Sequence, residues 1–332
     1  MNRLVATHRW AVVLAGGEGS RLRPLTRTLA GDDRPKQFCS ILGDRSLLDA
    51  TRRRVMLGVA PHRTLVVVTR THERFYLPTL ANMRVGAVVV QPENRGTAPA
   101  VLYALLRLAT LAPRDMVAFF PADHHVSDDR AFMTHVEAAF EASAYRPDLV
   151  TLLGMTPDGP DTGYGWIEPG EPLSWRKPKQ LCLVRSFLEK PAEPDSERYR
   201  AHGWLWNSFV MVARVSTLQA LIKSALPDLY AAFEPVRRCI GTVGEAHELE
   251  VVYCSLPTID FSRSVLGARP ANLAVLPVSG VQWSDLGDPS RVLRIRNSQV
   301  AIASTWTSRS LSWSAPDEEA WDQRDLNVPN IS

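Results

Sequence analysis

The sequence predicts an α/β protein in which helices cover both faces of a mostly parallel, mixed sheet, giving three layers, α/β/α. Two observations lead to this prediction. In the first half, short apolar runs rich in β-branched residues alternate with segments whose apolar residues recur at helical spacing. The runs are apolar on both faces, and each ends at a turn or an abrupt polar residue. Strands of this kind are typical of buried parallel sheets.

The individual elements follow this alternation along the chain. The expected strands cover residues 10–16, 64–69, 86–91, 115–123 and 148–154. The expected helices between them cover residues 46–58, 72–82, 98–112 and 129–142. Thr97 is placed to cap the third of these helices, with Pro99 tolerated in its first turn. Repeated strand–helix–strand units predict right-handed crossovers between parallel strands.

The rhythm changes in the second half of the chain. Residues 163–170, 183–191 and 205–213 look like strands and loops of a mixed insertion, and helical patterns follow across 215–250. The end of the chain is acidic and poor in periodicity, which is typical of a loosely docked or disordered segment. We therefore expect one large domain over residues 1–290 and a short, partly disordered C-terminal extension over 291–332.

The composition of the 332-residue chain argues against several classes of function. A formal net charge of +3 is too small for a dedicated nucleic-acid-binding surface, and the basic run Arg52–Arg54 fits the solvated face of a helix. No stretch approaches the roughly 18–20 apolar residues of a membrane span, and residues 1–10 lack the apolar core of a signal peptide. The four cysteines lie far apart without a C-x-x-C pair, which fits a reducing compartment. These features predict a cytoplasmic protein with no nucleic-acid or membrane partner.

The stretch VVLAGGEGSRLRPLTR, residues 12–27, joins an expected strand to a glycine-rich loop. The dinucleotide-binding pattern G-x-G-x-x-G fails because Leu22 stands at its third glycine, and the Gly-Lys-Ser/Thr ending of a Walker A loop is absent. What remains is a loop whose backbone N–H groups can approach a base or a polyphosphate, with Arg21, Arg23 and Lys36 as positive charges. Taken alone, a tight strand-to-helix turn with surface arginines explains the same residues equally well.

Further motifs give the loop a context. LAGGEGSRLRPLTR followed by RPKQF resembles the signature of sugar-1-phosphate nucleotidyltransferases, and its PKQF form is similar to that of mannose-1-phosphate guanylyltransferases, also called GDP-mannose pyrophosphorylases. Six more segments agree with that family in order. They are QPENRGTAPA (91–100), FFPADHHV (119–126), TGYGWIE (162–168), FLEKPAEPD (187–195), WNSF (206–209) and WSDLGD (283–288). The resemblance covers residues 11–288.

The resemblance implies a Rossmann-like (GT-A-like) nucleotidyltransferase domain and a reaction. GTP and α-D-mannose 1-phosphate would give GDP-mannose and pyrophosphate, by in-line attack of the sugar phosphate on the α-phosphorus without a covalent intermediate. Catalysis then consists of alignment and neutralisation of developing charge. The family also leads us to expect one Mg²⁺ as cofactor, GTP and mannose 1-phosphate as small-molecule partners, and a homodimer.

The motifs imply a role for each matched residue. The catalytic set is Arg21, Lys36, Asp123, Lys190 and Asp285. The nucleotide-binding set is Leu14, Ala15, Gly16, Gly17, Gly19, Ser20, Arg21, Lys36, Arg95, Gly96 and Thr97. The sugar-binding set is Gly165, Glu189, Lys190, Asn207 and Asp260. Asp123 and Asp285 would hold Mg²⁺, which prefers sparse carboxylate ligation, with Asp288 as a rival to Asp285. His124 and His125 lack a third ligand at a suitable spacing for zinc.

Two departures from the family pattern leave alternatives open. Phe209 replaces the glycine of the family's W-N-S-G segment, and the 258–266 segment keeps Asp260 but has Leu266 in place of an acid. Both changes concern the expected sugar half of the site. One alternative is therefore a nucleotidyltransferase with another nucleotide or hexose 1-phosphate. The other is a non-catalytic sugar-nucleotide-binding regulatory homologue, against which the presence of all the catalytic residues argues.

Overall fold

The computed structural model describes residues 8–84, 86–174 and 180–298. The chain divides into two compact units, residues 1–289 and 290–332. In the second unit, the described residues 290–298 are helical. The partly disordered extension is predicted over residues 291–332, of which 299–332 lie outside the described residues.

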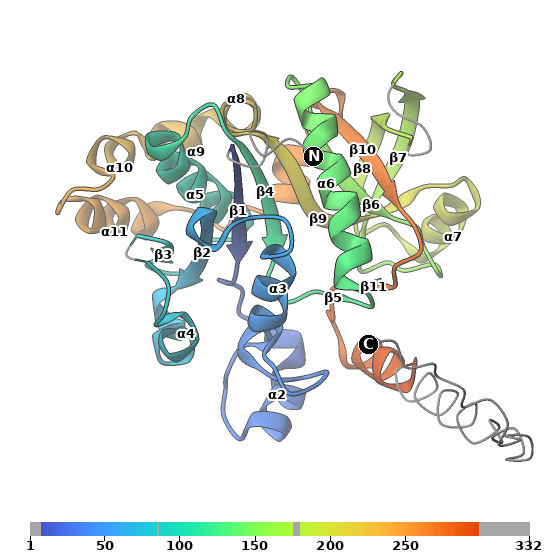
Figure 1. Cartoon of the computed structure of the whole chain (residues 1–332), viewed down its shortest axis with the longest axis horizontal. Helices are drawn as coiled ribbons and strands as arrows, with labels where there is room; N and C mark the ends of the chain where they lie inside the picture. Colours follow the sequence, from blue (N-terminus) through green and yellow to red (C-terminus); the bar gives the residue numbers. More distant parts are fainter. Residues whose placement is uncertain (1–7, 85, 175–179, 299–332) are drawn as a thin grey trace, which may run out of the picture. The chain divides into compact units, whose positions relative to one another are not determined.

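One large sheet organises the first unit, and it contains nine strands within the described residues (Figure 1). The strands are β1 (Arg9–Leu14), β2 (Thr64–Thr69), β3 (Val88–Gln91), β4 (Met116–Pro121), β6 (Val150–Met155), β7 (Gly165–Pro172), β8 (Cys182–Glu189), β9 (Leu205–Arg214) and β10 (Leu273–Val278). Their order across the sheet is β3-β2-β1-β4-β9-β6-β10-β8-β7. Two short strands, β5 (His125–Val126) and β11 (Trp283–Ser284), pair separately in antiparallel fashion.

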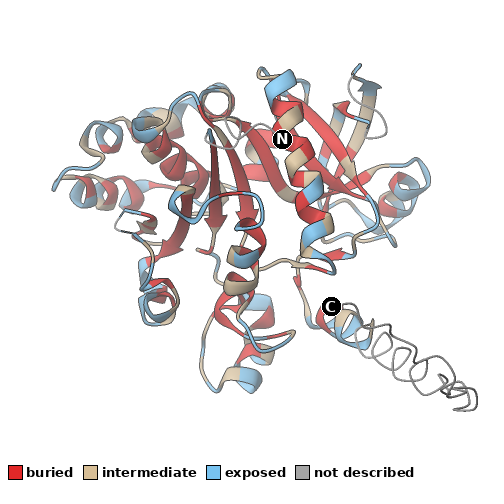
Figure 2. Cartoon of the chain, in the orientation of Figure 1, coloured by how far each residue is buried: buried red, intermediate tan, exposed pale blue. Residues whose placement is uncertain are grey.

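Helices cover both faces of the sheet, which confirms the three-layer prediction. They are α2 (Arg23–Ala30), α3 (Leu47–Val55), α4 (Glu73–Leu80), α5 (Thr97–Leu111), α6 (Asp129–Tyr145), α7 (Glu193–Ala201), α8 (Val215–Ala225), α9 (Pro227–Ala232), α10 (Glu234–Cys239) and α11 (Glu245–Ser255). Successive strand residues point to opposite faces, so Val12 packs in the core that contains α5, α8 and α11, while Val13 packs in the core that contains α3, α4 and α6. Figure 2 shows the strands as the most continuously buried part of the chain.

Antiparallel pairs occur only in the second half of the described sheet. β3, β2, β1 and β4 are parallel, as the strand–helix alternation predicts. β9 enters antiparallel between β4 and β6, and the β7–β8 and β8–β10 pairs are also antiparallel. β6 and β10 are parallel to each other, so within the described sheet only β8 and β9 run against the other seven strands, and the expectation of a mostly parallel, mixed sheet is confirmed. The insertion supplies antiparallel neighbours, which need no crossover helix.

Two local expectations need correction. β10 is not among the expected strands, although its buried run LAVLPV pairs with β6 and β8. The run Arg52–Arg54 is not uniformly solvated, because Arg54 is buried and its Nε lies 2.6 Å from Oδ1 of Asp129. A helix face turned partly toward α6 explains the pairing, since a buried guanidinium requires a carboxylate partner.

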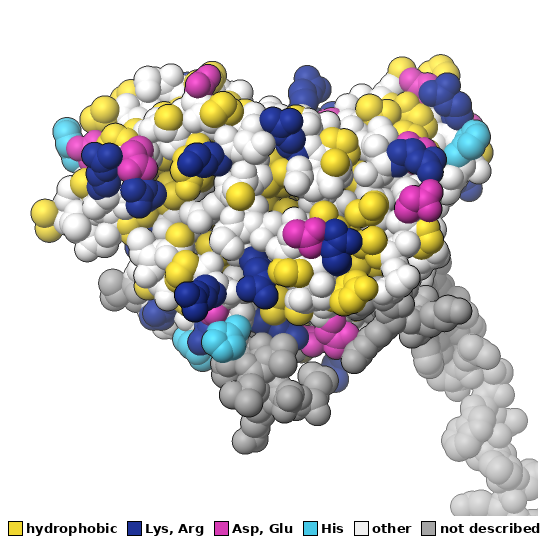
Figure 3. All heavy atoms as spheres, turned by 90° about the horizontal axis from the view of Figure 1, so that it is seen from above, with side chains coloured by type: hydrophobic (Ala, Val, Ile, Leu, Met, Phe, Trp, Pro, Cys, Tyr) yellow, Lys and Arg dark blue, Asp and Glu magenta, His cyan; other side chains and the backbone are white. Residues whose placement is uncertain are grey.

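Charged side chains are spread over the surface. On the face seen in Figure 3, Lys and Arg side chains lie among acidic and hydrophobic ones. This distribution agrees with the small net charge of +3. In the part of the chain that the structure describes, no helix has both the length and the apolar character needed to cross a bilayer.

Candidate functional site

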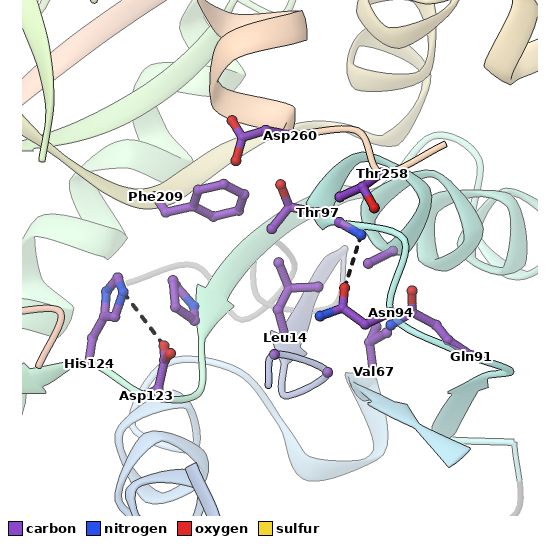
Figure 4. Close-up of a pocket in the computed structure, with 15 residues that line it drawn as sticks. Leu14, Val67, Gln91, Asn94, Thr97, Asp123, His124, Phe209, Thr258 and Asp260 are labelled. Atoms are coloured by element: carbon purple, nitrogen blue, oxygen red, sulfur yellow. Dashed lines mark hydrogen bonds and ion pairs between the residues drawn. The ribbon is translucent and has the colours of Figure 1, made fainter. Parts of the chain in front are cut away.

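A pocket of about 330 Å³ opens at the carboxyl ends of the parallel strands (Figure 4). Its lining residues come mostly from the segments that follow β1, β3 and β4 and from the chain around residues 258–260. They are Leu14, Gly16, Gly17, Val67, Gln91, Asn94, Gly96, Thr97, Ala100, Pro121, Asp123, His124, Phe209, Thr258 and Asp260. Open α/β sheets bind ligands at this edge, so the pocket is the candidate site.

The glycine loop, residues 15–19, begins where β1 ends. Its first residue extends the strand, because the Ala15 amide donates to the carbonyl of Val67 at 2.7 Å. The side-chain amide of Gln37 donates to the carbonyls of Ala15 and Gly17 at 3.0 and 2.7 Å. These bonds occupy carbonyl groups of the loop, which is therefore held by Gln37.

Gly19 ends the glycine loop in a left-handed conformation, with φ of 59°. A Cβ at this position would lie 3.0 Å from the backbone nitrogen of Lys36. Glycine is therefore favoured twice, by its backbone freedom and by the close approach of the lysine segment. Ser20 and Arg21 follow in a short 3₁₀ turn and are exposed. Arg21 has no hydrogen-bond or ion-pair partner among the described residues, so its guanidinium is free to meet an anion.

Lys36 connects the two predicted metal-binding segments. Its Nζ lies 3.1 Å from Oδ2 of Asp123, which follows β4. The same ammonium group donates to the backbone carbonyls of Asp285 and Leu286 at 2.7 and 3.2 Å. Because Lys36 is itself buried, these contacts bring Asp123 and the Asp285 segment together from positions far apart in the chain.

The charges around Asp123 favour its ionised form. Burial alone would raise the pKa of Asp123, but the charge of Lys36, the neighbouring His124 and the hydrogen bonds to the carboxylate together hold that pKa below its ordinary value. Burial lowers the pKa of the neighbouring His124, whose imidazole is therefore neutral near pH 7. The His124 ring packs edge-on against Trp283, with 5.2 Å between ring centroids. His124 thus supports the Asp123 loop.

The residues present fit a sparsely ligated Mg²⁺ and do not form a closed metal cage. Asp123 offers a carboxylate at the pocket, and Asp285 belongs to the segment bound by the same lysine. Among the described residues no group of three or more His, Cys, Asp or Glu side chains is arranged to hold a metal ion. Mg²⁺ is commonly bound by one or two carboxylates together with substrate phosphates, so a two-carboxylate donor set suits it.

Four of the five predicted sugar-binding residues, Gly165, Glu189, Lys190 and Asn207, lie together where β7, β8 and β9 meet, whereas Asp260 lines the pocket beside Thr258. Gly165 opens β7, and a Cβ there would lie 2.6 Å from Oε2 of Glu189 and 3.3 Å from Cβ of Asn207. A side chain at position 165 would therefore displace Glu189. Burial raises the pKa of Glu189, and the Nζ of Lys190, 3.2 Å from its Oε1, partly opposes this effect. The amide of Asn207 reaches the hydroxyl of Ser262 at 3.4 Å.

Phe209 lies in the pocket between the predicted nucleotide and sugar halves. Its φ of 59° is left-handed, a conformation that bulky residues rarely adopt. Its backbone amide donates to Oδ1 of Asn207 at 3.0 Å, and its ring packs against Phe261 at 5.9 Å between centroids. Figure 4 shows the ring in the pocket, near Asp260 and Thr97. The left-handed backbone explains why a glycine suits this position.

In the pocket wall formed by residues 94–97, Thr97 and Arg95 do not have the roles that the sequence predicts. Gly96, not Thr97, is the residue that precedes α5, and no side chain caps that helix. The Thr97 hydroxyl instead accepts a hydrogen bond from the backbone amide of Phe261 at 2.8 Å. The side chain of Arg95 turns to Glu93, at 2.8 Å, and does not line the pocket. Thr97 therefore joins two walls of the pocket and does not act as a helix cap.

Several pocket residues were missed by the sequence analysis, notably Gln91, Asn94 and Thr258. The signal for Gln91 was available, because it is the last residue of β3, at the same edge of the sheet as Asp123. The rule that selected Asp123 applies equally to the end of this strand. Thr258 has no such signal, since its place depends on how the 258–261 segment packs against residues 95–98.

Comparison with known proteins adds independent evidence. Residues 10–300 match the sequence family described as nucleotidyl transferase. The chain is 32% identical to the mannose-1-phosphate guanylyltransferase ManC of Salmonella typhimurium, over 87% of this chain and 60% of that protein. It is 33% identical to the alginate biosynthesis protein AlgA of Pseudomonas aeruginosa, over 85% of this chain and 57% of that protein. The chain thus spans about 60% of the length of the curated relatives it matches.

A solved structure shows the same fold. The mannose-1-phosphate geranyltransferase of Thermus thermophilus, as that structure is described, superposes with a TM-score of 0.71. The two chains are 31% identical, and the match covers 84% of this chain and 76% of the other. A glucose-1-phosphate thymidylyltransferase structure from Bacillus anthracis, 16% identical with a TM-score of 0.53, shares the fold alone.

Proposed function

Because this chain belongs to the nucleotidyl transferase family, we propose that it transfers GMP from GTP to α-D-mannose 1-phosphate, giving GDP-mannose and pyrophosphate. The observation that carries the proposal is the meeting of Lys36 with Asp123 and the Asp285 segment beside a pocket bordered by the glycine loop. A cation, a carboxylate and the backbone amides of a glycine-rich loop at one place suit phosphate chemistry. The names of the relatives supply the choice of guanine and mannose.

The chain's own residues then align two anionic reactants. The glycine loop and the free guanidinium of Arg21 bind the triphosphate, and Lys36 neutralises charge that develops toward the leaving pyrophosphate. Lys190 holds the phosphate of the sugar, while Glu189 and Asn207 bind its hydroxyls. An oxygen of the sugar phosphate attacks the α-phosphorus in line, and the bond to pyrophosphate breaks. No protein nucleophile is needed because the attacking oxygen is already ionised near pH 7.

Asp123 and Asp285 are the residues that would hold Mg²⁺. Held by these two carboxylates, Mg²⁺ would supply positive charge that offsets the negative charge of the phosphate groups. This assignment is testable without turnover. Binding of Mn²⁺, used as a paramagnetic substitute, should weaken at least about tenfold in Asp123→Asn and in Asp285→Asn. Asp148→Asn removes an exposed carboxylate away from the site and serves as the matched control. Unchanged Mn²⁺ binding in both site variants would refute the assignment.

The function is tested by the release of pyrophosphate from purified protein with Mg²⁺. Each of GTP, ATP, UTP, CTP and dTTP is combined with mannose 1-phosphate, glucose 1-phosphate and N-acetylglucosamine 1-phosphate. The proposal expects the fastest turnover with GTP and mannose 1-phosphate. Faster turnover with another pair would identify a different nucleotidyltransferase. Binding of GTP without turnover of any pair would establish the regulatory alternative, which the departure at Phe209 keeps open.

A further inference from the structure

Two side-chain amides on the pocket wall are bound to the protein through their oxygen atoms. Oε1 of Gln91 accepts a hydrogen bond from the phenol of Tyr253 at 2.9 Å. Oδ1 of Asn94 accepts one from the backbone amide of Gly96, also at 2.9 Å. Neither NH₂ group has an acceptor among the described residues. Figure 4 shows the bond from Asn94 to the Gly96 amide and places both amides at the pocket. This wall therefore offers amide donors to the pocket, whereas both amide oxygens are already engaged by the protein.

Tyr253 is well placed to hold the Gln91 amide in one orientation. It lies on α11, fully buried, and its ring packs edge-on against Phe233 at 6.0 Å between centroids. Burial raises the pKa of its hydroxyl, which therefore remains protonated and able to donate. Among the described residues, Gln91 is the hydrogen-bond partner of this hydroxyl.

Rotation of the Gln91 amide by a half-turn is unfavourable at both of its ends. With NH₂ against the phenol, the buried hydroxyl proton of Tyr253 would lose its acceptor, which costs the desolvation energy of that group. At the other end, a Cβ built on Gly16 would lie 2.7 Å from Nε2 of Gln91 and 2.9 Å from Oγ1 of Thr69, so both groups lie against Gly16. The Thr69 hydroxyl donates its proton to the Gly16 carbonyl, at 2.9 Å, so it has none for an amide oxygen.

We infer that Tyr253 is a positioning residue for base selection, which holds Gln91 so that the pocket presents NH₂ donors to the nucleobase. Guanine and uracil carry a carbonyl acceptor where adenine and cytosine carry an amino donor. Donors on the wall bind the first pair and oppose the second. The inference rests on the proposed function in one respect, namely that the pocket holds the base of a nucleoside triphosphate.

Matched nucleotides isolate this contact. ITP and ATP differ at C6 in having an oxo or an amino group, and UTP and CTP differ in the same way at C4. The dissociation constant of each is measured by calorimetry with the full-length protein. We expect wild-type protein to prefer ITP over ATP and UTP over CTP. In Tyr253→Phe the amide is free to rotate, so each preference should fall roughly tenfold.

Two further variants separate positioning from general structural damage. Gln91→Glu still offers an acceptor to Tyr253 but removes the NH₂ donor, so it should also lose the preference for ITP, and it tests the donor even where Tyr253→Phe fails to fold. Tyr103→Phe is the matched control, because Tyr103 is also buried and its hydroxyl donates to Glu245, at 2.6 Å, outside the pocket. It should keep the wild-type ratio. Both dissociation constants in each ratio are measured on the same variant, so a loss of folded protein affects them equally and leaves the ratio unchanged.

The inference is overturned if wild-type protein shows no preference for oxo bases. It is also overturned if Tyr253→Phe and Gln91→Glu both keep the wild-type ratio within about twofold, or if Tyr103→Phe lowers it equally. Binding ratios are measured without turnover, so the two claims fail separately. Absence of turnover would refute the proposed function, but the ratios of nucleotide dissociation constants could still be measured. Unaltered ratios in variants of an active enzyme would refute only the positioning role of Tyr253.

Discussion

The ammonium group of Lys36 lies 3.1 Å from Oδ2 of Asp123, and it also binds two backbone carbonyls of the Asp285–Leu286 segment. One side chain thus joins the turn after β4 to a segment far along the chain. Because both partners of the ion pair are largely withdrawn from water, loss of either one leaves the other charge poorly solvated.

A double-mutant cycle measures this pair. Lys36→Met and Asp123→Asn should each lower the free energy of unfolding by about 2–4 kcal/mol, and the double variant should lose less than the sum. Each single variant should reduce the rate of pyrophosphate release at least about 100-fold. Asp148→Asn, which breaks an exposed pair with Arg146, is the control and should change stability by less than about 1 kcal/mol. Additive losses in urea unfolding would show that the two residues are not coupled.

Gly96 and Gly17 provide a matched test of the two glycine-rich walls. Gly96 has φ of 85°, and a Cβ there would lie 2.4 Å from the carbonyl oxygen of Ile259. A Cβ built on Gly17 would have no atom within 4 Å. Gly96→Ala should therefore lower the free energy of unfolding by about 3 kcal/mol, whereas Gly17→Ala should change it by less than about 0.5 kcal/mol. Equal stability of the two variants in thermal unfolding would contradict the close contact at Gly96.

The residues differ in how far sequence could predict them. Asp123 follows a recognisable buried strand, and elementary rules place the end of such a strand at a binding edge. Gln91 lies at the end of β3 and follows from the same rule. Its bond to Tyr253 does not, because it joins positions 162 residues apart and depends on how α11 packs. The antiparallel course of β9 likewise depends on pairing with β4 and β6, which no local pattern encodes.

Phe209 offers a test of both backbone strain and pocket width. Phe209→Gly and Phe209→Ala remove the same ring from the pocket, but only glycine adopts φ of 59° without strain. The glycine variant should therefore be about 1 kcal/mol more stable than the alanine variant. Both should raise kcat/KM for mannose 1-phosphate, by roughly the tenfold that 1.4 kcal/mol represents, because a wider pocket receives the sugar more easily. An unchanged sugar preference would place the ring outside the path of the sugar.

Glu189 should reveal a conflict between stability and binding. Burial raises the pKa of this carboxyl, and Lys190 opposes the effect only in part. A folded-state pKa above the ordinary value means that the folded protein holds the proton more tightly than the unfolded chain. The contribution of Glu189 to the stability of the wild-type protein is therefore fully present below the ordinary pKa of Glu. It is lost as the pH rises through the raised pKa of the folded state. Glu189→Gln does not titrate, so its Tm relative to wild type should increase as pH rises from about 4 toward about 8.

The KM of Glu189→Gln for mannose 1-phosphate at the upper end of this range should rise at least about tenfold, since the carboxylate is expected to bind sugar hydroxyls. Glu193→Gln removes an exposed carboxylate nearby and controls for the change in net charge. If the difference in Tm between Glu189→Gln and wild type stays constant over this pH range, burial does not raise the pKa of Glu189.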